Sequence, residues 1–247
     1  MEVFDTHIHS EGRSVDDLRR MREKGIRWAV TCAFYPIEPK FPETLIDLFR
    51  KLTTFEVERG RKAGMEIVPA VGIHPRCIPP DYEKALNALE EFDCPLGEIG
   101  LETANDLEVE VFRKQLEFAK KHDRVCVIHT PKKNKVEVTK KTLSVLKDVR
   151  LPEDLAIVDH ATKDTVPMIL DAGYYVGLTV QVGKLKPEDV VEIVKEYGFE
   201  RFVLNSDTGF DEANMFATVE TVERIADEVG GDVERLAYKN ALNIFQM

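Results

Sequence analysis

The sequence predicts an α/β protein of the (β/α)8 TIM-barrel class, in either a regular or a distorted form. Residues 1–247 are expected to form a single domain. Eight short strand-like runs alternate with helix-like stretches along the 247 residues, and about 250 residues suit eight βα units. Several of the runs are continuously apolar, as strands of a parallel sheet covered on both faces tend to be. The alternative is an open doubly wound sheet, but no GxGxxG motif follows the first run. The closed barrel is therefore favoured.

The expected elements follow one another without a Ser/Gly-rich linker or a sequence repeat. The predicted strands are residues 2–9, 26–34, 65–74, 94–102, 125–130, 155–160, 174–180 and 202–207, and the helix-like stretches are residues 14–25, 42–64, 81–92, 107–122, 187–198 and 210–230. In the first helical stretch the apolar residues Val15, Leu18 and Met21 are three positions apart, and Gly25 predicts the end of the helix.

Composition and charge limit the function classes. Hydrophobic residues make up 43% and the formal net charge is -11, which argues against a general nucleic-acid coat protein or a binder of anionic membranes. It leaves open an enzyme with a locally positive site. The four cysteines form no CxxC pair and are expected to be buried free thiols. With no leader-like N-terminus and no apolar run near ~20 residues, we expect a cytoplasmic protein without a membrane partner. No obligate protein partner is evident.

Five of the six histidines end predicted strands. They are His7 and His9 in the first run, His74 in the third, His129 in the fifth and His160 in the sixth. The carboxyl ends of barrel strands form the active-site face. Any one histidine alone fits an ordinary hydrogen-bonded role better than a metal ligand, but the shared face favours a common site.

Carboxylates join the same face. Glu98 lies in the fourth run and Asp207 ends the eighth, and a lone acid in a strand is costly unless it is paired or bound to a metal. Because alternate strand residues share a face, Asp5 lies beneath the first histidine pair and Glu102 shares a face with Glu98. We expect Asp5 and Glu102 to support the ligands rather than to bind metal.

This set of side chains predicts two divalent metal ions. Four imidazoles and two carboxylates exceed the needs of one four-coordinate ion and suit a pair that shares a bridging carboxylate. The simplest partition gives His7, His9, Glu98 and Asp207 to one ion, and Glu98, His129 and His160 to the other. Zinc, manganese, nickel and magnesium all remain open as the metal.

Short motifs in order carry a family resemblance. DTHIH, VGIHP, GEIGLE, IHT, the His of VDH, the Asp of NSD and a closing NALNIF span residues 5–245. Together they resemble the TatD-like metal-dependent hydrolases, distorted TIM barrels of the amidohydrolase group. The resemblance implies divalent-metal hydrolysis, often of DNA phosphodiesters. It also implies that Glu98 bridges the metals, that Asp207 binds metal and handles the proton of the attacking water, and that His74 contacts the substrate.

The chain departs from the family pattern around the substrate. Glu102 stands where the family usually has Asp, and Pro131 stands where it usually has Arg, followed by Lys132 and Lys133. Residues 161–164 read ATKD instead of an aromatic, serine and glycine, and residues 206–209 read SDTG instead of TDxP. The metal ligands are kept while the surrounding residues change. Lys132 and Lys133 are candidates to contact phosphate; the alternative is a solvated helix face.

The favoured function is a phosphodiesterase or deoxyribonuclease acting on nucleic-acid ends, with single-stranded nucleic acid as a candidate partner. The same site would serve a hydrolase of another small substrate: a non-nucleic ester, an amide, a phosphomonoester or an aminoacyl-tRNA. A non-catalytic metal-binding scaffold is the third alternative. Asp207 argues against the scaffold, because a structural site gains nothing from an extra acid beside an open coordination position.

Overall fold

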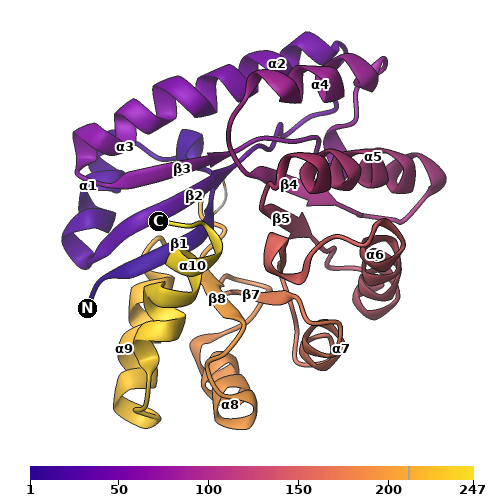
Figure 1. Ribbon diagram of the computed structural model, residues 1–247. Coiled ribbons are helices and arrows are strands. Elements are labelled where there is room, and N and C mark those ends of the chain that lie inside the picture. The colour runs from indigo at the N-terminus through magenta and orange to yellow at the C-terminus, as the bar shows by residue number, and fades with distance from the viewer. Residues whose placement is uncertain (211) are drawn as a thin grey trace.

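The computed structural model describes residues 1–210 and 212–247 and shows strands enclosed by helices (Figure 1). All the strand pairings are parallel. The strands are β1 (Val3–Ile8), β2 (Ile26–Cys32), β3 (Glu66–Ala70), β4 (Leu96–Gly100), β5 (Cys126–His129), β6 (Ala156–Val158), β7 (Tyr175–Thr179) and β8 (Phe202–Asn205). Each lies within a predicted run, so the predicted (β/α)8 class is confirmed.

The ring of strands is built from two sheets that meet at two seams. One sheet has the order β1-β2-β3 and the other β4-β5-β6-β7-β8. Isolated parallel bridges between Ile8 and Thr208 and between Val71 and Leu96 join them. At the first seam the Asp207 N–H donates to the His7 carbonyl oxygen at 2.9 Å. The barrel is therefore closed but distorted, and its first seam passes through two predicted metal ligands.

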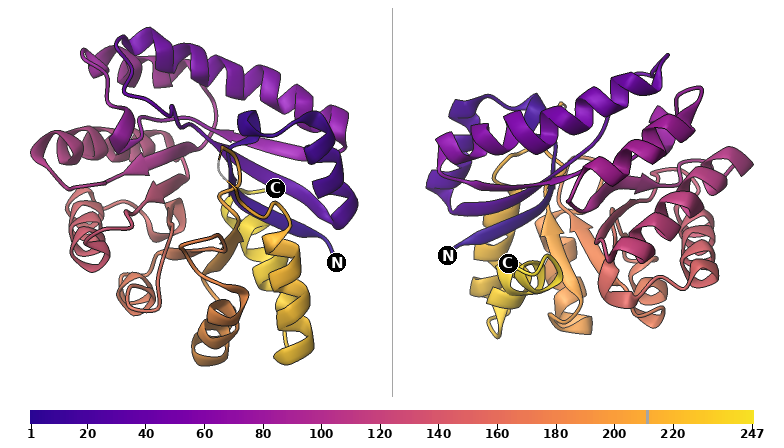
Figure 2. Two further views of the ribbon diagram at one scale, coloured as in Figure 1. Left: turned by 180° about the vertical axis from the view of Figure 1, so that it is seen from behind. Right: turned by 45° about the horizontal axis from the view of Figure 1, so that its top comes forward.

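The helices pack around the outside of the strands, as two further views show (Figure 2). The α-helices are α1 (Val15–Lys24), α2 (Pro42–Lys51), α3 (Val57–Ala63), α4 (Tyr82–Ala88), α5 (Asp106–His122), α6 (Lys135–Val149), α7 (Val166–Asp171), α8 (Pro187–Tyr197), α9 (Ala217–Glu228) and α10 (Asn240–Ile244). Short 3-10 turns are η1 (Ser10–Gly12), η3 (Pro75–Cys77), η4 (Leu89–Glu91) and η5 (Glu153–Leu155), and π-helical turns are η2 (Leu52–Glu56) and η6 (Arg235–Lys239).

Local sequence explains where these helices begin and end. Ser14 and Asp17 form a capping box at the start of α1, and Gly25 ends it in the left-handed conformation at φ 115°, as predicted. The stretch predicted at 42–64 becomes α2, η2 and α3 in direct succession. Helices α6 and α7 fill the two gaps for which no helix was predicted.

Apolar side chains fill the barrel and the layer between strands and helices. Phe4, Ile8 and Phe202 are fully buried, and Trp28 stacks on Phe4 at 6.1 Å between ring centroids. All four cysteines are buried free thiols within the described structure, as predicted. None of the described helices combines the length and the apolar character needed to cross a bilayer.

Candidate metal centre

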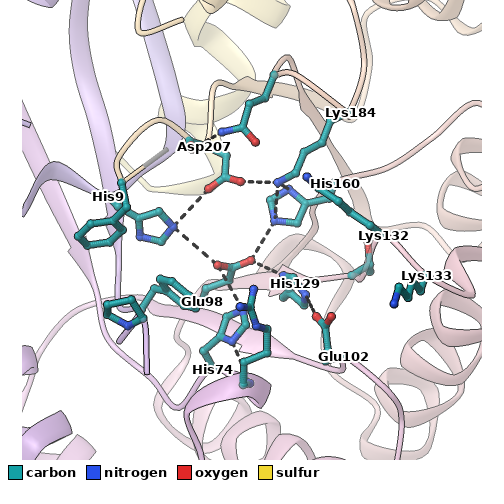
Figure 3. Close-up of a pocket in the computed structure, with 16 residues that line it drawn as sticks. His9, His74, Glu98, Glu102, His129, Lys132, Lys133, His160, Lys184 and Asp207 are labelled. Atoms are coloured by element: carbon teal, nitrogen blue, oxygen red, sulfur yellow. Dashed lines mark hydrogen bonds and ion pairs between the residues drawn. The ribbon is translucent and has the colours of Figure 1, made fainter. Parts of the chain in front are cut away.

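A cavity of about 570 Å³ opens at the carboxyl ends of the strands (Figure 3). Its walls are His9, Phe34, Pro36, His74, Arg76, Glu98, Glu102, His129, Thr130, Lys132, Lys133, His160, Gln181, Lys184, Asp207 and Phe210. Most of the residues predicted for the site therefore meet in one place. His7 is fully buried and does not line the cavity in the described structure.

Glu98 lies at the middle of this centre, and its two carboxylate oxygens face different histidine pairs. Oε2 lies 3.4 Å from His7 Nε2 and 3.9 Å from His9 Nε2. Oε1 lies 2.6 Å from His129 Nδ1 and 2.9 Å from His160 Nε2. One carboxylate therefore contacts histidines of both pairs, each pair through a different oxygen.

The first histidine pair presents one nitrogen to the centre and anchors the other. His7 Nδ1 lies 2.6 Å from Asp159 Oδ2, and His9 Nδ1 donates to the Cys32 carbonyl oxygen at 3.0 Å. These outer hydrogen bonds place a ring proton on Nδ1, so Nε2 is the nitrogen that can offer a lone pair to an ion. His7 Nε2 is buried and has no hydrogen-bond partner among the described residues. A buried ring nitrogen without a hydrogen-bond partner, aimed at two carboxylates, fits a metal ligand.

The second pair is anchored in the same manner. His129 Nε2 lies 2.8 Å from Glu102 Oε2, and His160 Nδ1 lies 2.8 Å from Thr179 Oγ1. The nitrogen that faces Glu98 is in each case the other one. Burial and the neighbouring Lys184 ammonium lower the pKa of His160 to about 4, so its ring is neutral near pH 7 and can offer a lone pair.

His74 differs from these four histidines. Its Nδ1 accepts a hydrogen bond from the Arg76 N–H at 3.0 Å, which places the proton on Nε2. Nε2 lies 3.6 Å from Glu98 Oε2, and burial holds the pKa of His74 well below its usual value. His74, Glu98 and His129 are close enough to share an ion, but a protonated Nε2 makes His74 a hydrogen-bond donor to the pocket.

Asp207 connects the first histidine pair to a lysine that the sequence did not reveal. Asp207 Oδ1 lies 3.2 Å from His9 Nε2 and 3.7 Å from His7 Nε2, and Oδ2 forms an ion pair with Lys184. Lys184 Nζ also lies 3.1 Å from His160 Nδ1. Lys184 follows β7, in a loop that returns to the ligand face, and its sequence context QVGKL carries no recognisable motif.

Both central carboxylates carry negative charge. Burial alone would raise the pKa of Glu98, but His7 and His129 beside it hold that pKa well below its usual value. Burial likewise opposes the charge of Asp207, but the His9 hydrogen bond and the Lys184 ammonium keep its pKa well below the usual range. Ionised carboxylate oxygens beside imidazole nitrogens are the donor set that a divalent transition metal binds.

The residues predicted to support the ligands lie at the edges of this centre. Asp5 is fully buried and accepts hydrogen bonds from the Ser206 N–H at 3.0 Å and the Ser206 hydroxyl at 2.6 Å. It thus braces β1 against the segment that carries Asp207. Glu102 holds His129, as described above.

The lysines after β5 have separate roles. Lys132 and Lys133 line the cavity. Lys135 instead donates to the carbonyl oxygens of Thr130 at 2.9 Å and His160 at 2.7 Å. It ties the loop after β5 to the loop after β6, and those hydrogen bonds occupy its ammonium.

The sequence prediction missed several residues that complete the site. Asp159 was present in the VDH run but its role depends on His7, 152 residues away. Its second oxygen accepts from Asn205 Nδ2 at 2.8 Å. Arg76 comes from the short 3-10 turn η3, and Gln181, Lys184, Phe34 and Phe210 come from loops. In neither setting does a periodicity predict the direction of a side chain.

Comparisons with known proteins give one consistent result. A family model described as TatD related DNase matches residues 4–246. An uncharacterized metal-dependent hydrolase of Methanocaldococcus jannaschii is 37% identical over 99% of this chain and 100% of its own. The crystal structure of a TatD-like protein from Archaeoglobus fulgidus is 46% identical, with a TM-score of 0.89 over 99% of this chain and 100% of that one. A TatD-family hydrolase from Entamoeba histolytica shares the fold, with a TM-score of 0.74 at 14% identity over 99% and 98% of the two chains.

Proposed function

Because the chain belongs to the TatD related DNase family of metal-dependent hydrolases, we propose that it hydrolyses phosphodiester bonds at nucleic-acid ends. We further propose that it uses two divalent ions bridged by Glu98. The observation that carries this proposal is the division of the Glu98 carboxylate, with Oε2 facing His7 and His9 while Oε1 faces His129 and His160.

The proposed ligands follow from this division. His7, His9, Glu98 and Asp207 would hold the first ion, and Glu98, His129 and His160 the second. Their outer hydrogen bonds to Asp159, Cys32, Glu102 and Thr179 support the assignment, because metal-ligating histidines typically donate their other N–H to a carboxylate or a carbonyl. Zinc, manganese, nickel and magnesium remain the candidate metals.

Two side chains would handle the reacting groups. Bound divalent ions lower the pKa of water towards neutrality and offset charge on the substrate. The ionised Asp207 carboxylate, held between His9 and Lys184, orients the attacking water and accepts its proton. His74, with its proton on Nε2, donates a hydrogen bond to a phosphoryl oxygen.

The charge around the pocket favours a phosphate substrate. Arg76, Lys132, Lys133 and Lys184 line the cavity of a protein whose net charge is -11. Such cations attract and orient anions, which a neutral ester or amide does not need. A phosphomonoester is the second candidate, because a cavity of about 570 Å³ also suits a small phosphorylated molecule.

Release of nucleotides from a single-stranded DNA oligomer, with Mn²⁺ or Mg²⁺, tests the proposal. Asp207→Asn should lower the rate by roughly a hundredfold or more, while Asp16→Asn, an exposed acid on α1, should leave it unchanged. Metal content is measured in each protein. A fully metallated wild-type protein that releases no nucleotide would contradict the nuclease assignment and direct the search to phosphomonoesters, esters, amides and aminoacyl-tRNA.

A further inference from the structure

The cavity has two chemically different walls. Phe34, Pro36 and Phe210 form an apolar side, whereas Lys132, Lys133 and Lys184 supply cations elsewhere around the same space. The metal centre described above lies in the same cavity. A ligand that uses all of it must combine an anionic group with a flat apolar group.

The aromatic side is built against the histidines of the centre. The Phe210 ring lies nearly parallel to the His9 ring, with centroids 5.8 Å apart and 30° between the planes. Phe34 meets the His74 ring edge-on at 5.0 Å. The centroids of Phe34 and Phe210 are 6.3 Å apart. The two phenyl rings therefore form one aromatic surface beside the metal centre.

The SDTG departure from the family pattern explains how Phe210 reaches this place. A Cβ atom on Gly209 would lie 2.5 Å from the His9 Cβ, so only glycine lets the backbone pass His9 this closely. The next residue can then cover the His9 ring.

Phe210 is also open to the cavity. It remains 46% exposed although it contacts His9 and Phe34. An aromatic ring that served only to pack His9 would be expected to be buried. An exposed ring face in a cavity is instead a surface on which a second flat ring can stack.

We propose that Phe34 and Phe210 form a base-stacking subsite for the terminal nucleotide of the substrate, an assignment that rests on the proposed phosphodiesterase function. The nucleobase lies on the aromatic side, and its phosphate faces the metal centre and the lysines. The cavity volume, about 570 Å³, suits one ligand-sized unit, so the subsite accepts a single unpaired nucleotide. Stacking of this kind tolerates any base, which predicts little sequence preference.

Binding of three small probes to the Mn²⁺-loaded protein tests this subsite independently of catalysis. The probes are thymidine 5′-monophosphate, 2-deoxyribose 5-phosphate and inorganic phosphate, measured by isothermal titration calorimetry. The wild-type protein should bind the nucleotide about five- to a hundredfold more tightly than the sugar phosphate. Phe210→Leu and Phe34→Leu should each remove most of that ratio and leave phosphate affinity and metal content unchanged.

Phe55→Leu is the matched control, because Phe55 is 58% exposed and does not line the described cavity. It should retain the wild-type ratio. Thermal melting shows that each variant is folded. The proposed subsite is refuted if the wild-type protein binds the nucleotide and the sugar phosphate with a ratio of affinities near one. It is also refuted if that ratio is unchanged in both Phe210→Leu and Phe34→Leu.

Hydrolysis of oligomers measured in parallel separates the two proposals. If the protein cleaves oligomers but binds the nucleotide no more tightly than the sugar phosphate, the stacking subsite is refuted and the proposed function is supported. Selective nucleotide binding without cleavage supports the subsite and refutes the nuclease assignment.

Discussion

The position of one ring proton separates the histidines of the centre by role. His7 and His9 use Nδ1 for Asp159 and Cys32 and so turn Nε2 towards Glu98, as the nitrogen whose lone pair an ion would bind. His74 accepts a hydrogen bond at Nδ1 and so presents a proton. Because a metal ion needs a lone pair and a phosphoryl oxygen needs a proton, these rings are expected to respond differently to substitution.

Asp159 should control metal affinity although it does not face the cavity. Asp159→Asn replaces a carboxylate whose Oδ2 lies 2.6 Å from His7 Nδ1 with an amide that can present its own proton to that nitrogen. We expect metal affinity to fall by roughly ten- to a hundredfold. Titration with Zn²⁺ or Mn²⁺ measures this, and Asp164→Asn, an exposed acid, is the control. Unchanged affinity in Asp159→Asn would show that His7 is not a ligand.

His74 should matter for turnover and not for metal binding. His74→Gln removes the proposed donor to the phosphoryl oxygen, so kcat should fall by roughly a hundredfold while metal content stays at the wild-type value. His9→Gln, which removes a proposed ligand, should lose metal as well as activity. Metal analysis beside steady-state kinetics distinguishes the two outcomes. Loss of metal from His74→Gln would assign His74 to the ligand set.

At the scale of elements, the sequence predicted the features that depend on hydrophobic periodicity and on the order of parallel strands. The apolar runs predicted the strands, and parallel strand order was enough to bring five histidines and two acids to one face. The strands end earlier than the predicted runs: β3 ends at Ala70, four residues before His74. Several site residues therefore belong to loops. Lys184, Phe34 and Phe210 could not be predicted, because a loop side chain is directed by tertiary contacts and not by a repeat.

The long helical segment 42–63 contacts the loop beside the candidate metal centre through its π-helical turn η2 and the start of α3. Glu56 is fully buried there. The Ser10 hydroxyl donates to Glu56 Oε2 at 2.8 Å, and Arg59 donates to the same oxygen at 2.5 Å. Arg59 also donates to the Ser10 carbonyl oxygen at 3.1 Å. Ser10 directly follows His9, so this segment covers the barrel and also holds the loop that carries a proposed ligand.

Breaking the ion pair between Glu56 and Arg59 should destabilise the fold. Glu56→Ala leaves the Arg59 guanidinium without its carboxylate, and only 13% of the Arg59 side chain is exposed. Loss of one partner of a buried pair typically costs about 3–5 kcal/mol. Urea unfolding should show that loss in the free energy of unfolding, whereas Glu58→Ala, on the exposed side of the same segment, should change it by less than about 1 kcal/mol. A loss below about 1 kcal/mol in Glu56→Ala would mean that the network is not structural.

At the scale of the whole molecule, the proposed ligands come from both sheets of the barrel. His7 and His9 belong to or follow β1 of the three-stranded sheet, and Glu98, His129, His160 and Asp207 belong to or follow strands of the five-stranded sheet. The ring is closed at the isolated bridges Ile8–Thr208 and Val71–Leu96 and by backbone hydrogen bonds beside them. An ion held by ligands from the two sheets would therefore act as a further link across the first seam.

Metal removal should then lower the thermal stability of the whole barrel. An ion that binds only the folded chain, present at a concentration of a hundred times its Kd, stabilises that chain by about 2.7 kcal/mol. Each kcal/mol shifts the Tm by about 2–4 °C in a chain of this size. We expect EDTA to lower the Tm by about 5–10 °C and added Zn²⁺ or Mn²⁺ to restore it. His9→Gln should lose most of this response, because the first site loses a ligand from the three-stranded sheet, while Asp16→Asn should retain it. Differential scanning fluorimetry measures each shift. An equal metal response in His9→Gln and the wild type would place the stabilising ion outside the proposed centre.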